Sequence, residues 1–314
     1  MASFMGFMGA KNMKFDIVAK RYWWFLLSAL IIIPGLISMA TQGLNLGIDF
    51  TGGTLIDLKF ARPVAVSEIR EVLKDYQLEG STIQLALTGQ EDKSNNVLIR
   101  SHVLNEEERR NVLKGLETKL GAFEVLRAEK VGAVIGAELA QQAVLALLIS
   151  WVLEIVYITY RFEFRFAVAG IAALVHDVLV VIGIFSILQK EIDSTFVAAI
   201  LTIIGYSIND TIVIFDRIRE NLKTYKKSDG LAELVNRSIW QTMTRSVYTV
   251  LTVLFATVAL YVFGGETTKN FSLALLIGFA SGAYSSIFNA SQIWVTWREY
   301  DDKRRMEQRI KGAK

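Results

Sequence analysis

Six long apolar segments constrain this chain more than any other feature of its sequence. A bilayer core about 30 Å thick is crossed by a helix of roughly 20 mostly apolar residues. Segments of that length occupy residues 22–42, 137–160, 166–188, 192–215, 246–264 and 269–297. The chain is also 52% hydrophobic and contains only two prolines among 314 residues. The sequence therefore predicts a membrane protein whose fold is an all-α bundle of six spans.

Lysines and arginines are distributed unevenly between the two sets of short loops. They are concentrated before the first span, between the second and third, between the fourth and fifth, and after the last. These residues are Lys11, Lys14, Lys20 and Arg21; Arg161 and Arg165; Arg217, Arg219, Lys223, Lys226, Lys227, Arg237 and Arg245; and Arg298, Lys303, Arg304, Arg305, Arg309, Lys311 and Lys314. The opposite short loops carry only Lys190 and Lys269. Because cytoplasmic loops are enriched in positive charge, we expect residues 1–21, the linker 216–245 and the tail 298–314 in the cytoplasm.

Residues 43–132, after the first span, form a long polar segment that we expect outside the membrane. Its pattern alternates strand-like and helix-like stretches: 54–60 strand, 66–76 helix, 81–88 strand, 96–100 strand, 105–120 helix and 123–131 strand. Ser67 and Asn105, each followed by glutamate, are candidate helix starts. The order βαββαβ predicts a small α+β domain of the ferredoxin-like kind, inserted between the first two spans.

Composition and motifs exclude several classes of function. The net charge of +3 and the absence of a basic, aromatic-rich stripe give no sign of nucleic-acid binding. With no cysteine and only two histidines, thiol chemistry and a His-rich metal site are not expected. The chain has no P-loop, no dinucleotide-binding GxGxxG, no GxSxG and no HExxH motif. We therefore predict a protein that is not an enzyme and that uses no cofactor and no bound metal.

Asp210 is the most informative polar residue within the predicted spans. It lies six residues before the charged exit at Asp216, or about 9 Å inside by helical rise. Ionisable groups in hydrocarbon cost roughly 2.5–3.5 kcal/mol each and tend to mark ion pathways. A structural hydrogen bond or a helix contact is the alternative interpretation. We favour a functional role for Asp210, with Asn209 beside it holding water or hydrogen bonds.

Two further polar positions accompany Asp210. Arg245 begins the fifth span, and Thr249 follows it one turn later on the same helix face. Alone, Arg245 would be an interfacial arginine that meets lipid phosphates, but a carboxylate in the preceding span gives it a partner. His176 and Asp177 lie near the middle of the third span. As neighbours they point about 100° apart and are not expected to face one partner, and a structural role for them is equally open.

Small residues recur at every fourth position of the last span. They are Ala274, Gly278, Gly282, Ser286 and Ala290. In lipid such a ladder lets two helices approach closely. The ladder is either an assembly face or a chance pattern in a helix rich in small residues.

Several of these motifs together resemble one family. The heptapeptide at 47–53, Gly-Ile-Asp-Phe-Thr-Gly-Gly, is similar to the GxDFTGG signature of the SecF branch of the SecD/SecF proteins. Residues 204–221, IGYSINDTIVIFDRIREN, are similar to that branch's most specific block. His176-Asp177, residues 241–245 (QTMTR), 263–265 (FGG) and 271–273 (FSL) fit in order and spacing, so that the resemblance covers nearly the whole chain. Gly52 and Gly53 suit a sharp turn after Asp49, Phe50 and Thr51. Gly205 suits close packing between helices.

The resemblance implies a function in protein export. It suggests a subunit of the Sec machinery that acts with SecD and couples the proton-motive force to late translocation of preproteins. SecD, the SecYEG translocon, YajC, unfolded preprotein and membrane lipid are the implied partners, and a bacterial inner membrane is the implied location. The family's proton-path aspartate, arginine and threonine correspond to Asp210, Arg245 and Thr249 of this chain.

Three other functions compete with a proton-driven export subunit. A transporter of a small molecule or lipid from the same resistance-nodulation-division superfamily would need a second six-span half and a substrate tunnel. A non-conducting scaffold for SecD would not need Asp210. An intramembrane protease would need a second catalytic aspartate motif, which the chain lacks.

Overall fold

The computed structural model describes residues 15–85, 93–225 and 230–312. Some of the predicted features fall outside these ranges: Lys11, Lys14, Lys226, Lys227, Lys314 and the last three residues of the expected strand 81–88. The described chain divides into two compact units. One contains residues 1–45 and 146–314, and the other contains residues 46–145.

The first unit is a bundle of long apolar helices. Six helices in the described part of the chain are long and apolar enough to cross a membrane, as the sequence predicts. They are α2 (Arg21–Thr41), α6 (Ala133–Arg161), α7 (Phe164–Ile187), α8 (Ser194–Leu222), α9 (Leu231–Phe263) and a last span made of α10 (Glu266–Ser285), the π-helical turn η3 (Ser286–Ala290) and α11 (Ser291–Gly312). The six-span fold class is confirmed.

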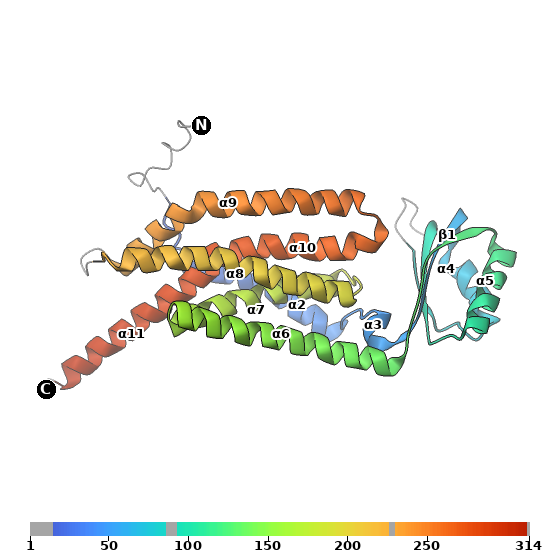
Figure 1. Cartoon of the computed structure of the whole chain (residues 1–314), viewed down its shortest axis with the longest axis horizontal. Coiled ribbons are helices and arrows are strands. Elements are labelled where there is room, and N and C mark those ends of the chain that lie inside the picture. The colour runs from blue at the N-terminus through green and yellow to red at the C-terminus, as the bar shows by residue number, and fades with distance from the viewer. Residues whose placement is uncertain (1–14, 86–92, 226–229, 313–314) are drawn as a thin grey trace, which may run out of the picture. The chain divides into compact units, whose positions relative to one another are not determined.

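Three of these spans form the interior of the bundle. In the most apolar 18-residue stretch of each span, 61% of the residues are buried in α7, 44% in α8 and 56% in the last span. The corresponding shares are 17% in α2, 17% in α9 and 6% in α6. Figure 1 shows α9 and α10 running side by side as an antiparallel pair. The helices α7, α8 and α10 therefore make the core, and the other three present most of their apolar surface outward.

Helix α2 is held on the core by two close contacts with α7. A Cβ added to Gly35 would lie 2.7 Å from the Cα of Gly183, so the two backbones touch at these glycines. Nearby, the hydroxyls of Ser38 and Ser186 are 2.9 Å apart. Small residues and a polar pair are the usual means by which helices associate in lipid, where apolar side chains alone give little preference for a partner.

The last span is interrupted by a π-helical turn that the sequence analysis does not anticipate. Residues Ser286–Ala290 make η3, between α10 and α11. A π turn accommodates one extra residue in a helix and is frequently found at functional sites. Four of its five residues are buried: Ser286, Ile287, Asn289 and Ala290. The turn lies within the core of the bundle.

The second unit contains a four-stranded antiparallel sheet with two helices. Its elements are β1 (Gly53–Ala65), α4 (Val66–Lys74), β2 (Thr82–Leu85), β3 (Lys93–Ser101), α5 (Glu106–Leu120) and β4 (Phe123–Val131), preceded by the single-turn helix α3 (Ile48–Thr51). The strand order is β2-β3-β1-β4. The predicted α+β class and the order βαββαβ are confirmed, and the strand order is that of a split βαβ unit.

The core of this unit lies between the sheet and its two helices. Ile56, Leu58 and Phe60 on β1 are at most 1% exposed, and they pack with apolar residues of α4 and α5. Helix α5 begins at the predicted Asn105, whose side chain forms a capping box with Glu108. Helix α4 begins at Val66 with Ala65 as its N-cap, so the expectation that Ser67 starts this helix is wrong.

Helix α9 is longer than the span that the sequence analysis places at 246–264. It runs without interruption from Leu231 to Phe263. Its first turns carry both a polar face and buried Leu234, Val235 and Ile239. Since α8 continues to Leu222 and α9 begins at Leu231, most of the expected linker 216–245 is helix.

Candidate functional site

Asp210 lies in α8 with its carboxylate enclosed between helices. The residue is 9% exposed. Its Oδ1 accepts a hydrogen bond of 2.6 Å from Ser246 Oγ of α9. Its Oδ2 is buried and has no hydrogen-bond partner among the described residues. A buried carboxylate with one bonded and one unbonded oxygen has a place for a proton, because the unbonded oxygen has no donor competing for it.

The other predicted residues of the proton path surround this acid without contacting it. Arg245 precedes Ser246 on α9, is exposed on this chain, and among the described residues no ion pair or hydrogen bond joins it to Asp210. Thr249 donates to carbonyls of its own helix, at 2.9 Å to Arg245 and 3.0 Å to Ser246. Asn209 is exposed on α8. Arg245 is thus the sequence neighbour of the residue that binds Asp210 but does not itself bind the acid, and Asn209 lies on the exposed surface of the chain.

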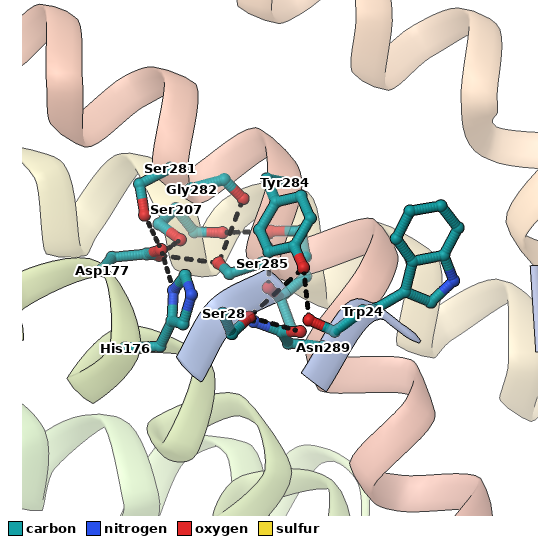
Figure 2. A network of polar contacts seen from close by, with 12 residues as sticks. Trp24, Ser28, His176, Asp177, Ser207, Ser281, Gly282, Tyr284, Ser285 and Asn289 are labelled. Atoms are coloured by element: carbon teal, nitrogen blue, oxygen red, sulfur yellow. Dashed lines mark hydrogen bonds and ion pairs between the residues drawn. The ribbon is translucent and has the colours of Figure 1, made fainter. Parts of the chain in front are cut away.

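Asp177 of α7 forms a second buried site that is bonded much more completely. It is 1% exposed. Its Oδ2 accepts from Ser207 of α8 and from Ser285 of α10, each at 2.7 Å, and its Oδ1 accepts from Ser281 of α10 at 2.6 Å. Figure 2 shows these hydroxyls converging on the carboxylate from two helices. Both oxygens are therefore occupied by donors.

His176 takes part in the same cluster. Its Nδ1 lies 3.1 Å from Asp177 Oδ1, and its ring lies 5.8 Å from that of Tyr284. The two side chains contact each other, but their other partners among the described residues differ, so the expectation that they do not face one partner is not contradicted. Their side chains fold back toward one another despite the angle between their positions on the helix. His176 Nε2 is buried and has no hydrogen-bond partner among the described residues.

Polar contacts continue from this cluster toward α2. Tyr284 donates to the carbonyl of Trp24 at 2.7 Å, and Asn289 Nδ2 donates to Ser28 Oγ at 2.9 Å (Figure 2). On the side of α8, the hydroxyls of Thr211 and Ser286 are 2.8 Å apart. The network therefore joins α2, α7, α8, α10 and η3 in the interior of the bundle.

The small-residue ladder of the last span packs against α8 of the same chain. A Cβ on Gly278 would meet Ile203 at 2.2 Å, and one on Gly282 would meet Ser207 Cβ at 2.9 Å. One further step along both helices brings Ser286 to Thr211. Rows of every fourth residue on the two helices thus run together, as in ridges-into-grooves packing. The ladder is therefore a packing face within this chain, and the prediction that it is an assembly face remains untested.

Two family models match the sequence of this chain. The model of the family described as "Protein export membrane protein SecD/SecF, C-terminal" matches residues 112–300, and the "SecD/SecF GG Motif" matches residues 37–64. The chain belongs to the SecD/SecF family. Its resemblance to that family, predicted from the motifs, is confirmed.

Individual relatives agree with the family assignment. The protein translocase subunit SecF of Acidaminococcus fermentans is 53% identical over 287 residues, which cover 91% of this chain and 98% of the relative. The SecDF protein of Bacillus subtilis is 39% identical over 91% of this chain, but the match covers 38% of that longer protein. The crystal structure of SecDF from Thermus thermophilus matches with a TM-score of 0.83 and 37% identity, over 91% of this chain and 39% of that one.

The GG motif of this SecD/SecF member forms a compact turn. Gly52 and Gly53 have φ angles of +71° and +139°, values that side-chain-bearing residues rarely adopt. A Cβ on Gly52 would lie 2.7 Å from the Cα of Ala133, and one on Gly53 would lie 2.5 Å from the carbonyl oxygen of Ser101. The preceding Asp49, Phe50 and Thr51 belong to the single-turn helix α3. We therefore keep the structural interpretation of residues 49–53 as a proposal, with the glycines needed for backbone shape and close approach.

Gly205 has no close packing neighbour among the described residues of this chain, although the sequence analysis predicts close helix packing there. A Cβ added there meets nothing within 4 Å, and the residue is exposed on this chain. The glycines that do permit close approach in this region are those on the opposing helix, Gly278 and Gly282. The prediction was based on the closeness of Gly205 to Asp210 in sequence. In the structure the two residues lie on different faces of α8.

Several residues of both sites are missed by sequence reasoning. Ser207, Ser246, Ser281 and Ser285 supply the donors, but serine is common in membrane helices and no spacing distinguishes these four. Glu154 of α6 is a clearer omission. It is an acid within an apolar span, and its Oε2 is buried without a hydrogen-bond partner among the described residues. The acid itself, seven residues before Arg161, was the available signal.

Proposed function

We propose that this chain is the SecF-type subunit of a bacterial protein-export complex. It acts with SecD in the inner membrane and couples the proton-motive force to late translocation of preproteins through SecYEG, with YajC as an accessory partner. The observation that carries this proposal is the carboxylate of Asp210, which is buried in a membrane helix and has one oxygen without a donor in the described part of the chain. It is supported by SecF relatives that match over nearly their full length.

The proposed cycle uses two states of Asp210. A charged carboxylate in a low-dielectric interior is stabilised by donors and nearby cations, whereas the protonated acid needs neither. Ser246 donates to Oδ1, and Arg245, which always keeps its proton, is the adjacent residue on α9. In the charged state Arg245 would approach the carboxylate, and in the protonated state it would withdraw. A proton taken up from outside and released inside would thus drive α9 between two positions relative to α8.

Two other functions are less well supported. A small-molecule or lipid transporter of the same superfamily would need a second six-span half and a substrate tunnel, and the described chain has six spans and a single small α+β unit. A scaffold that only stabilises SecD gives no reason for an acid with a free buried oxygen. We infer that catalysis of a chemical reaction is not the task of this subunit.

Export driven by a proton gradient tests the proposed function directly. The chain should co-purify with SecD from native membranes, and vesicles containing the complex should complete preprotein translocation faster with a gradient than with an uncoupler. Equal export in the two conditions, by vesicles that contain the intact complex, would show that the subunit is not proton-driven.

The proposed orientation gives a separate prediction. Because the chain has no cysteine, single cysteines can be placed without background. A cysteine replacing Lys93, in the α+β unit, should react with an impermeant thiol reagent applied to sealed cells, and one replacing Lys223, after α8, should react only after the membrane is opened. Reaction of the Lys223 variant in sealed cells would reverse the orientation.

A further inference from the structure

Asp177 joins the three most buried helices of the bundle at a single point. It belongs to α7, and its carboxylate accepts hydrogen bonds from Ser207 of α8 and from Ser281 and Ser285 of α10. Three helices can meet at this carboxylate because an ionised carboxylate has two oxygens with about four lone-pair positions that accept hydrogen bonds. Three hydroxyls and the imidazole of His176 fill those positions. Asp177 therefore has no free oxygen of the kind that Asp210 has.

Helix α8 carries Asp210 and also Ser207, a partner of Asp177, and the two side chains are directed at different helices. Ser207 faces Asp177, and Thr211, one turn further, faces Ser286 of η3. Asp210 faces α9 through Ser246. Gly278 and Gly282 also hold α10 closely against Ile203 and Ser207 of α8. One face of α8 is thus packed against α10 and hydrogen-bonded to α7 and η3 at successive turns.

Helix α9 is buried in the bundle much less than the helices joined at Asp177. In its most apolar 18-residue stretch 17% of the residues are buried, compared with 61% in α7 and 56% in the last span. Thr249, Thr252 and Thr257 donate to carbonyls of their own helix. Beside Asp210, the hydroxyl of Ser246 crosses to α8, and it binds the acid whose state would change. The other side-chain bonds between α8 and α9 lie at the far end of α8, where Asn221 donates to Ser238 and Gln241. Near Asp210, movement of α9 against α8 would therefore break the bond of Ser246, whereas movement of α8 against α7 and η3 would break the bonds Ser207–Asp177 and Thr211–Ser286.

We propose that Asp177 is a positioning residue for the proton-driven step. It bonds α7, α8 and α10 into one block, so that a change at Asp210 moves α9 against this block instead of displacing α8 within it. This inference rests on the proposed function, because it assigns the moving part of the same cycle. Removing the bonds of Asp177 should let α8 yield when Asp210 changes, and the motion of α9 would then be lost.

Distances between spin labels test which helices move. Ala198 of α8, Ala280 of α10 and Val262 of α9 are exposed on this chain and lie outside both polar sites. Cysteine pairs at 198/280 and 198/262 would be labelled in the purified complex with a cysteine-free SecD. Asp210→Asn, which resembles the protonated acid in shape, should change the 198/262 distance by about 1–2 Å, the usual size of helix shifts in switching proteins. The 198/280 distance should stay the same.

Asp177→Asn provides the second arm of the test. The amide replaces an acceptor with a donor where three hydroxyls already donate, so the 198/280 distance distribution should broaden. Export driven by the gradient should fall by about two- to thirtyfold, the range expected for changes along a coupling network. Export that resists an uncoupler should be unchanged. If Asp177→Asn reduces the amount of complex, Ser285→Ala removes a single donor and applies the same test more mildly.

The outcomes separate this inference from the proposed function. Wild-type, gradient-driven export by Asp210→Asn would overturn the proposed function and the step that Asp177 is said to support. If Asp210→Asn abolishes that export, two results overturn the block alone. One is an equal change of both distances in Asp210→Asn, and the other is an Asp177→Asn complex with unchanged distances and export.

Discussion

Replacing Asp210 with asparagine is expected to leave a stable complex with SecD and to abolish the part of export that depends on the proton gradient. Asparagine keeps the shape of the protonated acid and can still accept the hydrogen bond from Ser246, so the fold should persist. It cannot lose or gain a proton, so the cycle should stop in one state. Export should fall to the rate that an uncoupler gives in wild-type cells, measured at equal protein levels.

Arg245→Met should give a similar result, because it removes the only permanent charge proposed to distinguish the two states of Asp210. The matched control is Asp216→Asn on the same helix. Asp216 forms an exposed ion pair of 2.7 Å with Arg219 near the end of α8, and such pairs contribute little. Its export should match wild type. If the Asp210→Asn variant still exports at the wild-type rate and remains sensitive to an uncoupler, Asp210 is not part of the proton path. That result would favour the alternative in which the chain is only a scaffold for SecD.

Gly282→Leu should prevent the membrane unit from folding. The Cβ alone would lie 2.9 Å from Ser207 Cβ, and the remaining atoms of leucine would enter space that α8 occupies. Overpacking of this kind costs about 1–3 kcal/mol or more, and here it would also separate Ser207 from Asp177. Gly278→Leu should act in the same way against Ile203. The yield of chain that resists protease in detergent, and its thermal unfolding, would measure the loss.

Gly205→Ala is the control for this pair of variants. It adds a Cβ to a glycine of α8 where nothing lies within 4 Å, and alanine favours a helix by about 1 kcal/mol over glycine. Its stability should therefore equal or exceed that of wild type. Normal folding and export in both leucine variants would mean that α8 and α10 do not pack through this ladder.

The parts of the fold that follow from local pattern were predictable. The length of six apolar segments gives the spans, and alternating periods give the order βαββαβ. The start of α5 at Asn105 follows from its capping chemistry. The extent of α9 was harder, because its first turns carry charged residues beside buried Leu234 and Val235, and a hydropathy window averages these together.

The candidate site was predictable only where a residue is costly in lipid. Asp210 and Asp177 stand out because a carboxylate in hydrocarbon needs an explanation. Their partners depend on which helices are neighbours, and that is set by packing between segments far apart in the chain, such as Asp177 and Ser285. Gly205 and Gly282 illustrate the same limit. Both are glycines in membrane helices, but only the second faces another helix.

The π-helical turn at Ser286–Ala290 has a consequence for what later evolution or engineering can change in this chain. Each residue of an α-helix turns the chain by about 100°, so the extra residue sets the direction of every side chain that follows. With it, Trp294 is fully buried and lies flat against Phe166, at 4.6 Å between ring centroids. A chain one residue shorter in η3 would form a regular helix and point Trp294 elsewhere. The number of residues in this segment is therefore as much a part of the folding information as their identity.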